Sequence, residues 1–161
     1  MMGFFRGKRK YTGFDKNSSG KRAGVEKFKD WVVFLNGGKI TCKGTWVVRP
    51  MRGKSSPSVH GTGRAIDFGY TNREDCLNLI AFLERNWEAF GVEFIADYNV
   101  KPYGRGWRVD RLKWSNYSKG QISGGGESWA NWIHVELSNE VADDAAYFDA
   151  VFKCLLQPVA G

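Results

Sequence analysis

The feature that most constrains this chain is the ten-residue stretch 58–67, SVHGTGRAID, which places His60 and Asp67 seven positions apart. The chain has one other histidine, His134, far downstream in the short run 131–137. Two imidazoles and one carboxylate are the three protein ligands of a zinc site whose fourth position is open. The fold is therefore expected to bring these two distant segments together around a metal ion.

Both segments are predicted to be short strands. Residues 65–69 form a brief apolar run with Asp67 at its centre, which is typical of a buried strand. Polar and aliphatic residues alternate in 132–137, so His134 and Glu136 share one face of that strand. Because the aliphatic face belongs in the core, His134 and Glu136 are expected to face a cleft. A carboxylate in that position can orient the histidine, bind substrate or act as a base.

The remaining patterns predict one α+β domain, with a small antiparallel sheet that carries the zinc ligands and helices packed against it. Helices are predicted at 23–35, at 71–90 and from Asn139 to about 155, and further strands at 40–48 and 92–98. Thr71 and Glu74 have the spacing of a capping box. Residues 100–130 are expected to form a long loop with a short element near Trp107. Residues 1–22 are interpreted as a basic N-terminal arm that precedes the domain at 23–161.

Lys and Arg outnumber Asp and Glu, which gives a net charge of +7, and many of them lie in the first 30 residues. Such a block can attract a polyanion, whether nucleic acid, an acidic cell-wall polymer or an anionic membrane. Alternatively, it is a solvated arm that only keeps the protein in solution. No nucleic-acid-binding motif accompanies it. No apolar run reaches the length of a membrane span, and residues 1–10 lack the apolar stretch of a signal peptide.

The cysteine pattern excludes two classes of site. Cys42, Cys76 and Cys154 are odd in number and have no CxxC spacing. This pattern argues against a disulfide framework and against a thiolate metal site. Free, buried thiols are expected.

The stretch 58–67 matches all five fixed positions of the pattern SxHxxGxAxD. In this respect the chain resembles the M15-type D-Ala-D-Ala metallopeptidases, which include bacterial carboxypeptidases and dipeptidases and phage endolysins that cut peptidoglycan stem peptides. The later segment WIHVE resembles the family's second element, a strand that bears a zinc histidine. The resemblance covers roughly residues 40–137. It implies a zinc-binding α+β fold with His60, Asp67 and His134 as ligands.

The resemblance also implies roles for residues near the ligands. Arg49 and Arg52 resemble an arginine-bearing segment upstream of the first motif, and they would bind a substrate carboxylate or neutralise developing negative charge. Ser58 is expected to hydrogen-bond beside the ligands and not to act as a nucleophile, because no triad partner is present. The implied substrates are peptidoglycan stem peptides. The implied reaction is that of a D-Ala-D-Ala carboxypeptidase or that of an L-Ala-D-Glu endopeptidase.

One position departs from the family pattern. The family places an acidic general base three residues before its last ligand, where this chain has Asn131. A neutral amide cannot accept a proton from the attacking water, and the loss of general-base help costs about two to four orders of magnitude in rate. Either Glu136 or Glu127 takes this role, or the chain is a catalytically impaired relative. Such a relative would bind the cell wall or serve as a structural phage tail protein.

The resemblance and the charge together indicate where such a protein acts. Without a signal peptide, a basic enzyme of this type is expected to be a phage lysin or a virion component of the tail. It would reside in the virion, or in the host cytoplasm before its release to the cell wall. In a tail, other phage tail proteins would be its partners.

Overall fold

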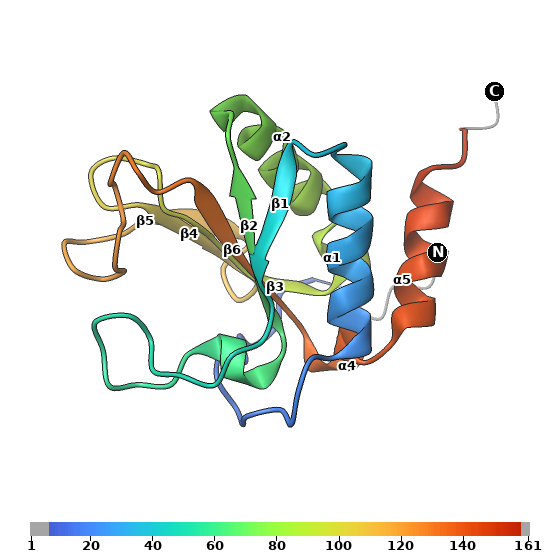
Figure 1. Ribbon diagram of the computed structural model, residues 1–161, viewed down its shortest axis with the longest axis horizontal. Helices are drawn as coiled ribbons and strands as arrows, with labels where there is room; N and C mark the ends of the chain where they lie inside the picture. The colour runs from blue at the N-terminus through green and yellow to red at the C-terminus, as the bar shows by residue number, and fades with distance from the viewer. Residues whose placement is uncertain (1–6, 159–161) are drawn as a thin grey trace.

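The computed structural model describes residues 7–158, which form one six-stranded antiparallel sheet with helices (Figure 1). The strands are β1 (Ile40–Gly44), β2 (Ala65–Tyr70), β3 (Val92–Asp97), β4 (Arg105–Arg108), β5 (Lys113–Asn116) and β6 (Trp132–Leu137). Their order across the sheet is β1-β2-β6-β3-β4-β5. The last strand of the sequence, β6, therefore lies inside the sheet, between β2 and β3.

Helices pack against one face of this sheet, and α1 and α5 lie side by side there (Figure 1). The helices are α1 (Ala23–Leu35), α2 (Arg73–Arg85), α3 (Trp87–Phe90), α4 (Asn139–Ala142) and α5 (Ala145–Leu155), and a 3-10 turn, η1 (Val59–Thr62), precedes β2. The predicted α+β class is confirmed. No helix in residues 7–158 is both long enough and apolar enough to cross a membrane.

The core between helices and sheet is rich in phenylalanine. Its fully buried rings are Phe28, Phe68, Phe90, Phe148 and Phe152. The ring of Phe28 on α1 lies 5.2 Å from both Phe90 and Phe148, measured between centroids. The aliphatic residues of β6 enter the same cluster, as the alternation predicts. His134 and Glu136 consequently face the opposite side of the sheet.

Three predicted element boundaries are corrected. The N-cap of α2 is Asn72 and not Thr71, because the Asn72 side chain accepts a hydrogen bond from the backbone N–H of Glu74 (2.9 Å). The helix predicted at 71–90 is divided at Asn86, whose side-chain amide donates to the Phe82 carbonyl (2.9 Å). The last helix is divided between α4 and α5, where the side chain of Asp144 caps α5. Such side chains compete with the backbone for hydrogen bonds and favour helix ends.

Two further expectations need smaller corrections. The strand predicted at 40–48 ends at Gly44, and the loop predicted at 100–130 contains the hairpin of β4 and β5. The cysteines are free as expected, but Cys154 is exposed and only Cys76 is fully buried.

The segment before α1 has no helix or strand, but it is not a solvated arm over residues 9–22. Arg9 forms an ion pair with the buried Glu93 (2.9 Å). The backbone N–H of Ser18 donates to the Gly61 carbonyl (2.7 Å). Arg22 binds both oxygens of Asp143, although Asp143 itself is largely exposed. Residues 9–22 are therefore packed along the domain. Acidic residues of the domain partly neutralise the basic side chains of this segment. Residues 1–6 lie outside the described part of the chain.

Candidate metal centre

The 3-10 turn η1 and strand β2 present the first two candidate ligands. Ser58 caps the turn, because its Oγ accepts a hydrogen bond from the backbone N–H of His60 (3.3 Å). Gly63 follows with a φ of +73°, a left-handed conformation that favours glycine, and redirects the chain into β2. Two fixed positions of the sequence pattern thus have a structural reason. Ser58 and Gly63 shape the turn that brings His60 to Asp67.

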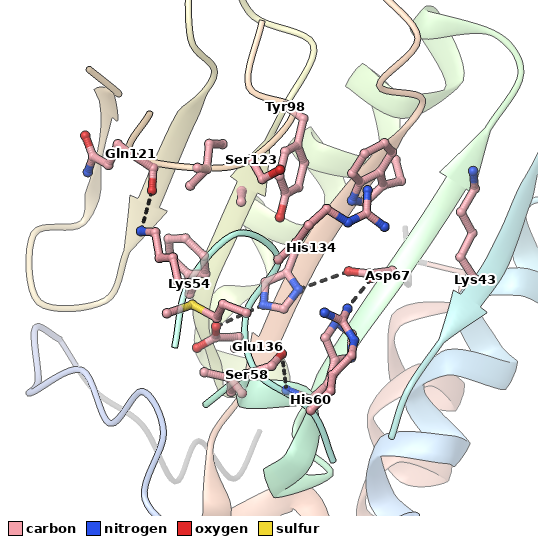
Figure 2. Close-up of a pocket in the computed structure, with 18 of the residues that line it drawn as sticks. Lys43, Lys54, Ser58, His60, Asp67, Tyr98, Gln121, Ser123, His134 and Glu136 are labelled. Atoms are coloured by element: carbon pink, nitrogen blue, oxygen red, sulfur yellow. Dashed lines mark hydrogen bonds and ion pairs between the residues drawn. The ribbon is translucent and has the colours of Figure 1, made fainter. Parts of the chain in front are cut away.

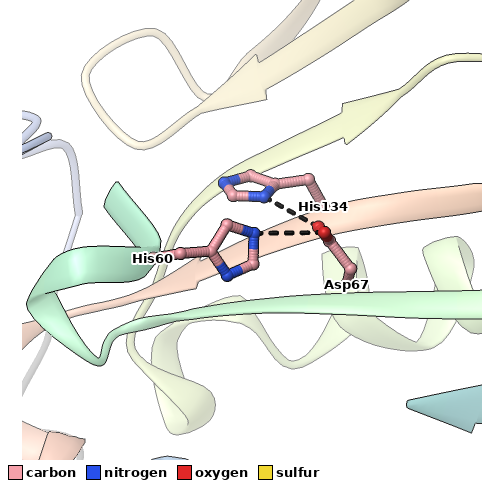
Figure 3. A group of neighbouring side chains, drawn as sticks. All are labelled: His60, Asp67 and His134. Carbon is pink, nitrogen blue, oxygen red and sulfur yellow. Dashed lines mark hydrogen bonds and ion pairs between the residues drawn. The ribbon is translucent and has the colours of Figure 1, made fainter. Parts of the chain in front are cut away.

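Strand pairing supplies the third candidate ligand. In the register of β2 and β6, Asp67 lies directly opposite His134. His60 Nε2 lies 3.1 Å from Asp67 Oδ2, and His134 Nδ1 lies 3.0 Å from Asp67 Oδ1. The two imidazole rings flank the carboxylate, with centroids 4.9 Å apart (Figure 3). The fold therefore brings together the two segments that carry the histidines.

This donor set fits a small divalent cation such as zinc. One nitrogen of each histidine and one Asp67 oxygen lie within 4.8 Å of one another. Imidazole nitrogen and carboxylate oxygen are both ordinary zinc ligands, and three of them leave a fourth position open. His60 Nδ1 is buried and has no hydrogen-bond partner within the described residues. The protein therefore does not itself saturate the polar atoms of this cluster.

Charges within the cluster stabilise one another. Burial works against ionised Asp67, but hydrogen bonds from His134 and His60 outweigh it and hold the pKa of Asp67 well below its usual range. Burial likewise disfavours the imidazolium of His134, yet hydrogen bonds to Asp67 and Glu136 outweigh it and raise the pKa of His134 to about 10. In the metal-free chain, His134 is therefore protonated at neutral pH. A cation that binds through His134 has to displace this proton.

Glu136 is 2% exposed, and both of its oxygens are engaged. Oε1 lies 2.9 Å from His134 Nε2, and Oε2 accepts a hydrogen bond from the Tyr11 hydroxyl (2.6 Å). Burial and the Glu136 charge raise the pKa of Tyr11 far above its usual value, so this hydroxyl remains a donor. His134 Nε2 then keeps its proton toward Glu136, which leaves Nδ1 to bind a cation. Among the roles left open for Glu136, these contacts fit the orientation of His134.

The cluster lies in a cleft of about 510 Å³ on the sheet face opposite the helices (Figure 2). Four basic side chains line the cleft: Lys43, Arg49, Arg52 and Lys54. Its carboxylates, Asp67 and Glu136, already contact the histidines. The unpaired charge of the cleft is therefore positive, which favours negatively charged ligands.

The two predicted arginines lie in this cleft but are exposed at its rim. Arg49 donates to the carbonyl oxygen of its neighbour Pro50 (3.2 Å). Arg52 has no ion-pair partner within residues 7–158. Both guanidinium groups are thus free to bind a ligand that enters the cleft.

The fold places Glu136 and Glu127, the two predicted substitutes for the missing base, in different surroundings. Glu127 is exposed and does not line the cleft. Asn131 lies immediately before β6, where its Oδ1 accepts a hydrogen bond from Lys43 Nζ (2.8 Å). Among the described residues, Asp67 and Glu136 are the only carboxylates that line the cleft. Of the two predicted substitutes, only Glu136 therefore lies in the cleft.

Sequence patterns miss several residues of the cleft, among them Tyr11, Lys43 and Tyr98. Tyr98 continues the alternation of Phe94 and Ala96 along β3, so the strand pattern held a signal for it. Tyr11 had no such signal, because it lies in a segment without periodicity. Lys43 is one of many lysines, and only the strand pairing places it beside the cleft.

Comparison of the chain with protein-family profiles, with curated proteins and with solved structures finds no match. A function for this cleft therefore has to be inferred from its side chains and from the sequence pattern they carry.

Proposed function

We propose that the chain is a zinc-dependent peptidase that hydrolyses peptide bonds next to D-amino acids in bacterial peptidoglycan. The observation that carries this proposal is the meeting of His60, Asp67 and His134 in an open cleft. These residues come from the two segments that resemble the M15-type metallopeptidases. An enzyme with this charge would act as a phage lysin or as a component of a phage tail.

Zinc would be held by His60 Nε2, an Asp67 oxygen and His134 Nδ1. When bound, zinc supplies a Lewis acid that polarises a carbonyl group and lowers the pKa of water. The chain's own contribution is orientation. Ser58 holds the backbone of the turn that carries His60, and Glu136 fixes the ring of His134. Partners of this kind fix the tautomer of a ligand and typically contribute about ten- to a hundredfold to metal affinity.

Two groups of side chains would act on the peptide. Arg49 and Arg52 at the rim can bind a substrate carboxylate in bidentate fashion or neutralise developing negative charge. Among the described residues that line the cleft, Glu136 is the one carboxylate besides Asp67, and it would accept a proton from the attacking water. It must first give up a hydrogen bond from Tyr11 or His134. This competition predicts a slow enzyme.

The same contacts favour a second candidate, a wall-binding or structural tail protein without turnover. Asn131 replaces the family's acid and is bound to Lys43, and both Glu136 oxygens are occupied. A cleft with a metal cluster but without a free base still binds an anionic peptide.

The direct test is metal analysis of the purified full chain together with its action on purified peptidoglycan. About one zinc per chain and the release of shortened stem peptides, both abolished by a chelator, are expected for the peptidase. Mass analysis of the released peptides identifies the bond that is cut. Zinc without peptide release would leave the wall-binding candidate. A chain that takes up no zinc at neutral pH would contradict both.

Zinc binding is expected to release about one proton per ion at pH 7 to 8. The reason is that His134, with its pKa raised from 6.5 to about 10, is protonated in the metal-free chain. Because the folded pKa is the higher one, protonated His134 stabilises the metal-free fold below about pH 6.5. This stabilisation is lost as the pH rises toward 10. Calorimetric titration of zinc in buffers of different ionisation enthalpy measures the released proton. Heats that do not depend on the buffer would refute this expectation.

A further inference from the structure

Lys43 lies across the cleft-side face of β2, over Gly69. A Cβ on Gly69 would lie 2.5 Å from Lys43 Cε and 3.1 Å from its Cγ, so the missing side chain leaves room for the lysine stem. Gly69 comes two residues after Asp67 and therefore faces the same side of the strand, about 7 Å away. The lysine is thus directed over the sheet beside the metal cluster, and it lines the cleft (Figure 2).

The ammonium group of Lys43 is held without being neutralised. Its Nζ donates to Asn131 Oδ1 (2.8 Å) and lies 5.7 Å from the centroid of the Trp132 ring. Among the described residues, no carboxylate forms an ion pair with it. Because an ammonium only donates, Asn131 must present its oxygen to Lys43. Its NH₂ group forms no hydrogen bond within the described residues and remains a donor.

The neutral amide of Asn131 affects the charge of the cleft as well as the supply of a catalytic base. An aspartate or glutamate at this position would pair with Lys43 and cancel its charge. The amide instead fixes the lysine and leaves the positive charge in the cleft. Lys43 Nζ and Asn131 Nδ2 then offer neighbouring N–H donors with one net positive charge. This arrangement suits a planar carboxylate, which can accept one hydrogen bond on each oxygen.

We propose that Lys43, which lines the cleft, and Asn131, which lies just outside it, form a recognition site for a carboxylate of the bound peptide at the β1 edge of the cleft. The site is separate from Arg49 and Arg52, which lie on the loop before η1. This inference rests on the proposed function for the presence of a peptide in the cleft. It does not require that the peptide be cut.

The test compares peptides that differ in one group. Two pairs of stem-type tetrapeptides are used, one with a free or amidated glutamate α-carboxylate and one with a free or amidated C-terminus. Their dissociation constants for the full chain are measured by calorimetry in the presence of a chelator, which prevents turnover. For one pair, the free acid is expected to bind about ten- to a hundredfold more tightly, because a hydrogen bond to a charged group is lost in the amide.

Variants assign this preference to the two residues. Lys43→Met is expected to abolish it, and Lys43→Arg is expected to retain most of it. Asn131→Asp is expected to abolish it as well, because the new carboxylate neutralises Lys43. The matched control is Lys39→Met, which removes the same charge from a lysine that pairs with Asp75 outside the cleft (3.7 Å). This control is expected to leave the preference unchanged.

Three results would overturn the inference: no preference in either pair, no binding of any peptide, or a preference that persists in Lys43→Met. Peptide release from peptidoglycan by the zinc-loaded chain is measured separately. A preference without release would support the carboxylate site and contradict the peptidase. Release without a preference would support the peptidase and contradict the carboxylate site.

Discussion

Replacing His134 with alanine is expected to abolish stoichiometric zinc binding and to reduce peptide release to background. Four-ligand zinc sites bind with about 10–16 kcal/mol, so one ligand contributes about 3 kcal/mol, or at least about a hundredfold in affinity. His134 also separates Asp67 from Glu136, which it contacts at 3.0 and 2.9 Å. Its loss leaves Asp67 and the buried Glu136 without their shared partner. Zinc content after dialysis, measured by atomic spectroscopy, checks the first part of this expectation.

Controls separate a ligand from a merely structural residue. His60→Ala and Asp67→Ala are expected to lose zinc to a similar extent, because each provides one atom of the cluster. Asn116→Ala, on the exposed edge strand β5, is expected to retain both zinc and release. A His134→Ala chain that still carries one zinc per molecule would show that the cluster is not the metal site.

Replacing Arg64 with methionine is expected to lower the free energy of unfolding by about 3–5 kcal/mol. Arg64 is 0% exposed, and its guanidinium donates to the carbonyl oxygens of Leu137 (2.9 Å) and Gly13. It also lies 3.7 Å from Glu93, which is itself buried. Without it, two carbonyl groups lose a donor and a buried carboxylate loses a positive neighbour. Urea unfolding followed by circular dichroism measures the change.

The loss should also depend on pH. Burial raises the pKa of Glu93, although Arg9, Thr12 and Arg64 act in the opposite direction. Removal of Arg64 raises this pKa further, so the variant is stabilised at low pH and loses this stability as Glu93 ionises. The destabilisation is therefore expected to be larger at pH 8 than at pH 5. Lys27→Met breaks an exposed ion pair with Asp149 and should cost less than about 1 kcal/mol. An equally small effect for Arg64→Met would contradict its structural role.

Features that depend on residue spacing along the chain could be predicted from the sequence. The alternation in 132–137 correctly predicts which side of β6 enters the core, because side chains of a strand alternate regardless of its neighbours. The helix at 23–35 follows from its apolar spacing and from the glycines after it. The convergence of His60, Asp67 and His134 was expected from a motif and not from periodicity.

Other features depend on contacts that no local pattern contains. The position of β6 between β2 and β3 depends on pairing between strands that are far apart in the sequence. Arg64 is a charged residue whose complete burial is possible only because Gly13, Leu137 and Glu93 surround it. Tyr11 reaches Glu136 from a segment without regular structure. The choice of Asn72 over Thr71 as a helix cap involves a shift of one residue, which composition cannot resolve.

The hydrogen bond between Tyr11 and Glu136 spans 125 positions of the sequence, and this has a consequence during synthesis. At about 5–20 residues per second, the ribosome needs about 6–25 s to add those positions. Once residue 67 has been added, the nascent chain contains His60 and Asp67 but still lacks the strand that must insert between β2 and β3. The candidate ligand set therefore forms only once translation has passed β6. An unfinished chain cannot assemble the cleft, so any activity of the cleft begins only when nearly the whole domain has been made.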